Sequence, residues 1–412
     1  MNGSRPWSEV VEVLRLPHFT PFLATRIGAA MGVWMERLAT GWLAWDLTQS
    51  TAWLGVIAFL RMAPALALGL VGGAWADRTT PRRVLLWGKS GLVVANAAMV
   101  LLLIGGSTTI WALALMALSV GVLQALSNPA AATIIWDLVP RHHLSRAITI
   151  NSLGFHVATF AGPALAGGIA LVAGFGSVYA IAAAGQTAMI VALLKLPSPA
   201  QATSAKRKLT LWADIVEGIA YVRREPPVFA ILAVHFIFAI SAYPLIDMVP
   251  AIASVLLDGG ANEVSALMAA MGAGAIAGGI WLAAVAPKSA LKLAVGIALL
   301  CLMVQIVALS ATRALPLALA LMAGIGACQV IRASGLQTLL QLTVSEEMRG
   351  RAMGFYGLLI RGGSAFGALA IGVASEAIGL PTALATAASL GVCVLLIFAV
   401  RHRQDLSRIS VS

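Results

Sequence analysis

The sequence predicts an all-α membrane protein with twelve transmembrane helices in two related six-helix halves around a central cavity. Three observations predict it. Of the 412 residues, 60% are hydrophobic and only 10% are charged, whereas a soluble domain carries roughly 25% charged residues. Apolar segments of spanning length recur along the whole chain, and residues 121–168 of its first half align without a gap with residues 326–373 of its second half.

Twelve segments are long and apolar enough to cross a bilayer, because a spanning helix needs about 20 predominantly apolar residues. Glycine-rich turns separate several of them, for example at residues 105–107, 174–177 and 258–260. We expect helices at residues 19–48, 53–75, 84–105, 109–136, 145–172, 177–195, 228–257, 263–286, 290–311, 315–342, 351–376 and 380–400.

The placement of the cations orients these helices. If both termini are cytoplasmic, 21 of the 27 Lys and Arg residues lie on the cytoplasmic side, one (Arg313) lies on the opposite side, and five lie inside spans. Such an excess is what the positive-inside rule predicts. The net charge of +11 is therefore spread over short loops, which excludes nucleic acid as a partner and predicts a multi-pass protein embedded in a lipid bilayer.

The chain divides around its one long polar segment. Residues 1–17 predict a cytoplasmic amphipathic segment, and residues 18–195 predict the N-terminal six-helix half. Residues 196–227 predict a cytoplasmic central loop with a surface helix at 211–224, residues 228–400 the C-terminal half, and residues 401–412 a cytoplasmic tail. A displacement of 205 residues aligns 121–168 with 326–373 and pairs nine identical residues, which indicates an internal duplication.

A charged motif stands between the second and third predicted helices. Gly73, Asp77 and Arg78 are followed by Arg82 and Arg83. The segment resembles the G-x-x-x-D-R…R-R signature of the major facilitator superfamily, and we expect it to form a conformational latch between helices. An acid placed among cations at a helix end can make charge-assisted bonds that break when the cytoplasmic side opens.

Further segments resemble the bacterial drug and siderophore exporters of this superfamily, the enterobactin-exporter-like branch. They are residues 34–50, 128–130 and 339–351. In the fifth predicted helix, Gly162, Pro163 and Gly167 resemble the antiporter motif of the family, with Ala166 in place of one glycine. The resemblance associates this motif with export, and the alternative is ordinary packing of small residues. The branch implies the bacterial inner (plasma) membrane as the location.

Ionisable residues inside the spans are candidate functional residues, because a charge at this depth costs at least about 2.5–3.5 kcal/mol. Glu36 lies near the middle of the first helix, and we expect it to take up and release a proton. The alternative is a static ion pair, most simply with Arg61. Arg37 shares one face of that helix with Arg26, eleven residues away, and Arg26 is more readily explained by a structural role.

Arg332 and Arg361 lie well inside the tenth and eleventh predicted helices. Under the 205-residue displacement, Arg361 corresponds to His156. We expect these basic groups to bind an anionic group on a substrate, since arginine offers a bidentate fork. The repeat-related Gln124 and Gln329 are candidates for amide hydrogen bonds to the same substrate. The alternative is that each arginine neutralises an acid, Glu36 or Asp247.

Asp247 lies beside Tyr243 and Pro244, where the seventh helix is expected to break. A local pair or a helix cap is its simplest role, and an outer gate is the alternative.

Taken together, the sequence predicts a secondary active transporter that works by alternating access. The resemblance implies a proton-coupled exporter of a small amphiphilic or anionic compound, a drug or a siderophore, acting as a monomer. An importer or lipid flippase of the same fold is an alternative, as is a membrane sensor or scaffold that transports nothing. We find no nucleotide-binding loop, metal-ligand cluster or nucleophile triad in the sequence, so we expect neither an enzyme nor a cofactor.

Overall fold

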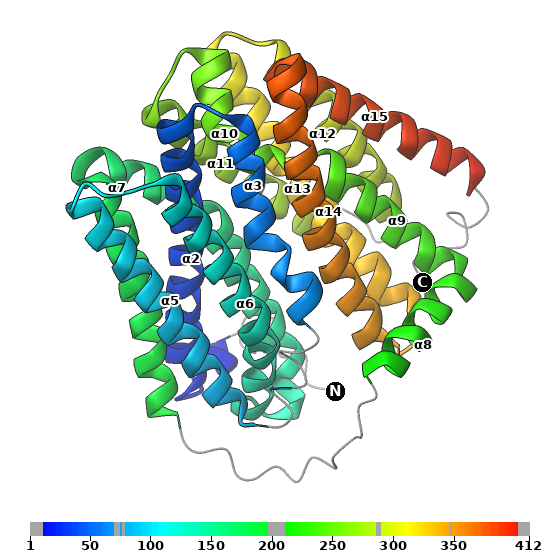
Figure 1. Ribbon diagram of the computed structural model, residues 1–412. Coiled ribbons are helices and arrows are strands. Elements are labelled where there is room, and N and C mark those ends of the chain that lie inside the picture. The colour runs from blue at the N-terminus through cyan, green and yellow to red at the C-terminus, as the bar shows by residue number, and fades with distance from the viewer. Residues whose placement is uncertain are drawn as a thin grey trace. The chain divides into compact units, whose positions relative to one another are not determined.

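The computed structural model describes residues 11–69, 75, 79–196, 211–285, 290–346 and 348–402. Every regular element in these ranges is a helix (Figure 1). The all-α prediction is therefore confirmed, and the fold class is that of a polytopic membrane protein.

Ten helical stretches in the described ranges are long and apolar enough to span a membrane. One of them, Arg146–Lys195, is 50 residues long and contains Gly174 in a non-helical conformation with φ 76°. Because glycine adopts positive φ without steric cost, the chain bends there and two spans are joined end to end. The helix Phe19–Thr48, which is 30 residues long, lies outside those ten. If Arg146–Lys195 is counted as two spans and Phe19–Thr48 is added, the ten stretches agree with the twelve predicted spans.

The predicted boundaries agree with the observed ones to within a few residues for most helices. The main elements are α2 (Phe19–Thr48), α3 (Thr51–Met62), α5 (Pro81–Ile104), α6 (Ile110–Leu138), α7 (Leu144–Lys195), α8 (Leu211–Arg224), α9 (Pro226–Ser241), α10 (Leu245–Ala251), α11 (Ala261–Val285), α12 (Leu291–Ala311), α13 (Leu315–Thr343), α14 (Arg349–Ile378) and α15 (Leu380–Arg401).

The seventh predicted helix is broken where the sequence indicates. Helix α9 ends at Ser241, α10 begins at Leu245 after Pro244, and a π-helical turn follows from Ile252 to Leu256. Proline cannot donate the backbone hydrogen bond that would continue α9. Three elements, α9, α10 and the π-helical turn, thus stand where the sequence predicts one long helix.

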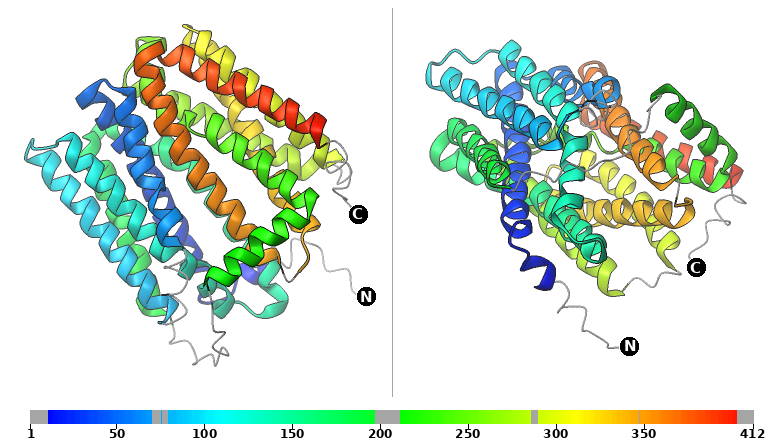
Figure 2. Two further views of the ribbon diagram at one scale, coloured as in Figure 1. Left: turned by 45° about the vertical axis from the view of Figure 1, so that its right-hand side comes forward. Right: turned by 90° about the horizontal axis from the view of Figure 1, so that it is seen from below.

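The described chain falls into two compact units that differ from the predicted halves at one place. The first unit contains Met1–Thr40 and Ala67–Lys208, and the second contains Gly41–Leu66 and Leu209–Ser412. Helix α3 is therefore grouped with the second unit, because it packs along α14 (Figures 1 and 2). The two six-helix halves, residues 18–195 and 228–400, remain a prediction from the internal duplication.

Small residues bring the helices of each unit together. In the first unit, a side chain at Gly162 of α7 would lie 2.8 Å from the carbonyl oxygen of Met31 in α2. In the second, a side chain at Gly367 of α14 would collide with the carbonyl of Ile240 in α9. Gly162 and Gly367 are partners under the 205-residue displacement. Corresponding helices thus pack through corresponding glycines, as a duplication would produce.

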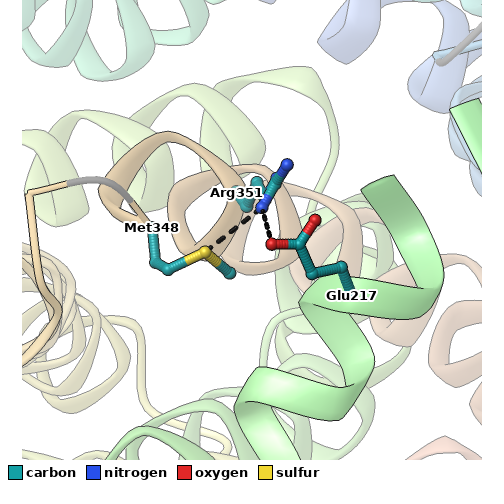
Figure 3. A network of polar contacts seen from close by, with 3 residues as sticks. All are labelled: Glu217, Met348 and Arg351. Atoms are coloured by element: carbon teal, nitrogen blue, oxygen red, sulfur yellow. Dashed lines mark hydrogen bonds and ion pairs between the residues drawn. The ribbon is translucent and has the colours of Figure 1, made fainter. Parts of the chain in front are cut away.

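A glutamate in the N-terminal segment and one on α8 each contact the region where a long helix of the same unit begins. Glu12 lies 3.5 Å from Nε2 of His143 in the first unit. In the second unit, a carboxylate oxygen of Glu217 on α8 lies 2.8 Å from Nη1 of Arg351 on α14, beside Met348 (Figure 3). Glu12 and Glu217 are also separated by 205 residues. The predicted surface helix at 211–224 is confirmed with the same bounds.

Candidate functional site

Arg332 occupies the interior of the second unit, on α13. Its side chain is buried, with 2% exposure. Nη1 lies 3.2 Å from Nδ1 of His235 on α9, and the guanidinium carbon lies 3.7 Å from the ring centroid of Phe238, one turn further along α9. The neighbours of this cation are therefore a neutral nitrogen base, an aromatic face and the phenol of Tyr356 on α14, none of which carries a negative charge.

This contact determines the protonation state of His235. A guanidinium has donors and no acceptor, so Nδ1 of His235 must accept the hydrogen bond and carries no proton. The imidazole is then neutral with its proton on Nε2. Tyr356 of α14 stacks on this ring, with centroids 3.7 Å apart and an interplanar angle of 16°, and its hydroxyl donates to the carbonyl of Ala333 at 3.1 Å. We call His235, Phe238, Arg332 and Tyr356 the arginine–aromatic cluster.

Two donors of this cluster have no partner among the described residues. They are Nε of Arg332 and Nε2 of His235, both fully buried. Leaving a buried donor unpaired costs about 1–3 kcal/mol. The cation–π contact with Phe238 contributes about 0.5–2 kcal/mol, which offsets only part of the cost of burying the charge. The cluster can therefore donate hydrogen bonds to an added acceptor, and its charge favours an anion.

The second predicted arginine lies near the same cluster. Arg361 on α14 is half-buried, and its guanidinium makes no hydrogen bond or ion pair with the described residues. Tyr243 is close enough to interact electrostatically with both Arg332 and Arg361. Gln329, one turn before Arg332, has a buried side-chain oxygen without a partner in the described ranges. The structure thus groups three of the five predicted substrate-binding residues in one unit.

The remaining two predicted substrate-binding residues belong to the first unit. Gln124 on α6 is half-buried. His156 lies on α7, but its side chain is outside the described part of the structure. The structure therefore does not extend the anion-binding prediction to these two positions.

The alternative role predicted for the two arginines finds no support in the described residues. Neither Arg332 nor Arg361 forms an ion pair with a carboxylate there. Glu36 is 1% exposed, and Arg37 and Arg61 are buried. These three residues and Asp247 each have an interaction partner, so none of the four is a free charge.

Arg26 is satisfied in a different way. Its Nη1 donates to the carbonyl of Ala131 in α6 at 2.7 Å, which agrees with the structural role expected for it. Thr40, one turn after Glu36, donates to the Glu36 carbonyl at 2.7 Å, and its hydroxyl lies 2.8 Å from that of Tyr179. The contact between the two hydroxyls holds α2 against the second part of α7.

The predicted latch lies partly outside the described residues: Gly73, Asp77 and Arg78 are not described. Arg82 donates to the carbonyls of Leu194 and Leu196 at 2.7 and 3.0 Å. It therefore ties the start of α5 to the end of α7, whereas Arg83 is exposed.

In the antiporter-like motif, Gly162, Pro163 and Gly167 are all buried. The contact of Gly162 with α2 shows that this segment is at least a close helix-packing site. A packing role for this segment is compatible with the association between the antiporter motif and export, which stays a prediction.

Sequence reasoning did not identify His235, Phe238 or Tyr356 as site residues, and it named Tyr243 only as a neighbour of the expected helix break. One signal was present. The chain has only four tyrosines, and two of them lie in the spans near the predicted arginines.

A helical protein with ten apolar spans in its described ranges and a buried cationic cluster has the architecture of a membrane transporter. A family model described as a transmembrane secretion effector, of the major facilitator type, matches residues 11–410. The chain belongs to this family, and the superfamily predicted from its motifs is confirmed.

Two curated relatives are similar over parts of the chain. One is named a staphyloferrin A transporter of Staphylococcus aureus and is 27% identical over 143 residues, which are 34% of this chain and 36% of that protein. The other is named an uncharacterized MFS-type transporter, YfiS, of Bacillus subtilis and is 24% identical over 208 residues, 50% of this chain and 49% of that protein. The chain thus matches about half of each relative's length or less.

Solved structures share the fold at low identity. A bacterial homolog of the human lysosomal transporter Spinster, in an inward-facing and occupied conformation, has a TM-score of 0.68 and 16% identity, with 99% of this chain and 97% of that chain covered. The nucleoside transporter NupG has a TM-score of 0.68 and 14% identity, with 93% and 98% covered. These likenesses confirm the major facilitator fold.

Proposed function

We propose that this protein is a secondary active transporter that exports a small anionic or amphiphilic compound by alternating access. The observation that carries the proposal is Arg332, a buried cation whose neighbours are neutral and whose Nε has no partner among the described residues. If this position served only stability, an apolar side chain would be expected there, or an arginine paired with a carboxylate. A site that binds an anion instead needs a positive charge that no carboxylate of the protein already neutralises.

The cluster suggests how a substrate would be held. An anionic group accepts from Arg332 and His235, while Arg361, half-buried nearby, supplies a second positive charge. Transporters of this architecture bind substrate near the bilayer midplane and expose it to each side in turn. Because Arg332 is buried in this conformation, the substrate's access to it must depend on helix movement.

We propose that Glu36 carries the coupling proton, because a deeply buried carboxyl is the kind of group that exchanges protons in transporters. A static pair with Arg61 is the competing role. If Glu36→Gln retained full proton-driven transport, the carrier role would be abandoned.

The proposal places the protein in a bacterial inner membrane as a functional monomer, with both termini in the cytoplasm. The distribution of cations supports this orientation, and the similarity to a protein named as a staphyloferrin A transporter supports a cargo of the siderophore class.

Efflux from membrane vesicles with an imposed proton gradient tests this function. A panel of labelled organic anions and lipophilic cations is compared with and without the protein. We expect saturable efflux of anions, and a half-saturation concentration about tenfold or more higher in Arg332→Ala, since an interaction with a buried charge is worth at least one factor of ten. Arg313→Ala is the matched control, because Arg313 is exposed and donates to the carbonyl of Val255.

Two outcomes would overturn the proposal. Efflux of lipophilic cations without any anion would exclude the anionic substrate. No gradient-driven transport for any compound, together with a stable partner that co-purifies, would favour the sensor or scaffold.

A further inference from the structure

Helices α3 and α14 are in backbone contact along a seam of glycines. A side chain at Gly55 would lie 2.6 Å from the carbonyl oxygen of Ala368, and one at Gly372 would collide with the carbonyl of Thr51. Thr51 is buried and donates through its hydroxyl to the Gly372 carbonyl at 3.0 Å. The two helices lie side by side in Figure 1 and in the left view of Figure 2.

One carboxylate closes the end of this seam. Oε1 of Glu376, on the last turns of α14, accepts from the Ser50 hydroxyl at 2.7 Å and from the backbone N–H of Ala52 at 3.0 Å. It also lies 3.1 Å from the Thr51 hydroxyl, whose single hydrogen is shared with the Gly372 carbonyl. All three donors belong to the first residues of α3 or to its N-cap. Some 320 residues of sequence separate the two sides of the contact.

The arrangement is an N-terminal helix cap supplied by a different helix. The first four N–H groups of a helix have no partner within it, and a negative charge near this end is favoured by the helix dipole. Ser50 caps α3 locally by accepting from the N–H of Trp53. Glu376 adds a charged acceptor for Ala52, so the start of α3 is tied to α14 by charge-assisted bonds.

We propose that Glu376 is a latch that holds α3 against α14 at the outer end of the transporter and must release for the outward-open state. The proposal rests on the orientation given under Proposed function, which places the start of α3 and the end of α14 outside. By sequence, α3 belongs to the first six-helix half and α14 to the second. Movement of the halves in alternating access therefore has to break this seam, and the carboxylate is its peripheral contact.

The same unit contains a matched control. Glu263 of α11 accepts from the N–H of Gly260 at 2.6 Å, so it is also a glutamate that caps a helix start, but it caps its own helix. If capping alone were important, Glu376→Gln and Glu263→Gln would behave alike. If Glu376 holds two helices together, only its substitution will open the seam.

Cysteine labelling from outside tests the latch without any substrate. In the full-length protein with Cys301, Cys328 and Cys393 replaced by serine, Thr51→Cys places a single thiol in the seam. Intact cells are treated with a membrane-impermeant maleimide. We expect slow labelling in this background and in Glu263→Gln, faster labelling in Glu376→Gln, and the fastest in Glu376→Ala. The increase for Glu376→Ala should be about fivefold to tenfold, because bonds to a charged acceptor are strong but this carboxylate is exposed to solvent.

Equal labelling rates in Glu376→Ala, Glu376→Gln and the background would overturn the latch. Labelling that occurs only in inside-out vesicles would also overturn it, because the seam would then lie on the cytoplasmic side. If Glu376→Ala does not accumulate, Glu376→Gln and Ser50→Ala decide between the same outcomes. The labelling assay uses neither a substrate nor a proton gradient, so a failure of the proposed anion transport and a failure of the latch are distinguishable.

Discussion

Helices α6 and α13 occupy corresponding places in the two repeats, yet one position shows how far they have diverged. Under the 205-residue displacement, Ser127 of α6 corresponds to Arg332 of α13. The Ser127 hydroxyl is buried and donates to the Leu123 carbonyl of its own helix at 2.6 Å. A side chain at Gly88 of α5 would lie 2.6 Å from Ser127 Cβ, so this position serves close packing.

Arg332 fills the corresponding position with a long charged side chain that is not fully satisfied. The divergence continues nearby, where Asn151 corresponds to Tyr356 and His156 to Arg361. The repeat has kept its packing glycines, Gly162 and Gly367, while changing its polar residues. Packing through glycines is therefore shared between the two repeats, whereas the proposed anion site belongs to the second unit.

The largest expected effect tests the shared packing. Gly367→Val and Gly162→Val should both reduce the yield of folded protein strongly, because each new side chain meets a backbone carbonyl, and overpacking costs typically 1–3 kcal/mol or more. Gly357→Val is the control, since nothing lies within 4 Å of the added carbon. Yield and thermal midpoint in detergent measure the effect. A folded, stable Gly367→Val would contradict the close approach to Ile240.

The next effect separates function from stability at the divergent position. Arg332→Met should raise the half-saturation concentration of anion efflux about tenfold or more, as in Arg332→Ala. It should leave the thermal midpoint unchanged or raised, because replacing a buried charge by an apolar residue of similar size is often neutral or stabilising. Ser127→Ala should change efflux little. A fall in the midpoint of Arg332→Met that matches its loss of efflux would instead give Arg332 a structural role.

A smaller effect is expected at His235. His235→Asn keeps an acceptor near the place of Nδ1, whereas His235→Ala removes it. We expect a half-saturation concentration about threefold to tenfold higher in His235→Ala, in keeping with the loss of a hydrogen bond to a charged group, and partial recovery in His235→Asn. Turnover at saturating substrate should change less. Equal behaviour of the two variants would show that the hydrogen bond to Arg332 does not matter.

The smallest effect is expected at the surface contact in Figure 3. The side chain of Glu217 is 61% exposed and that of Arg351 is 21% exposed. Exposed ion pairs contribute about 0–1 kcal/mol, so a double-mutant cycle of Glu217→Gln and Arg351→Gln should give a coupling energy in this range. A larger coupling would make the docking of α8 a significant part of the stability of the second unit.

Much of the fold was predictable because its determinants are local. Hydropathy over about 20 residues located the spans, and Leu211–Arg224 was predicted with the bounds that the structure shows. The break before α10 followed from Pro244. The bend at Gly174, where φ is 76°, also coincides with a predicted turn, and it separates the two spans that the sequence predicts on either side.

The candidate site was predictable only in part. Arg332 and Arg361 stood out because a charge in an apolar segment is visible in one dimension. His235, Phe238 and Tyr356 did not stand out, because aromatic residues are common in membrane helices and their neighbours depend on which faces of α9, α13 and α14 meet.

The sequence by itself determined the class of protein, the number of spans and the positions of the buried arginines, since hydrophobicity and charge are properties of each segment alone. Only the tertiary structure decided that a histidine and aromatic rings surround Arg332, and that Glu376 caps the start of α3 from a distant helix. The physical reason is that such contacts depend on helix packing, which small residues allow at many places along a helix, so the pairs of helices that actually pack cannot be deduced from any one segment.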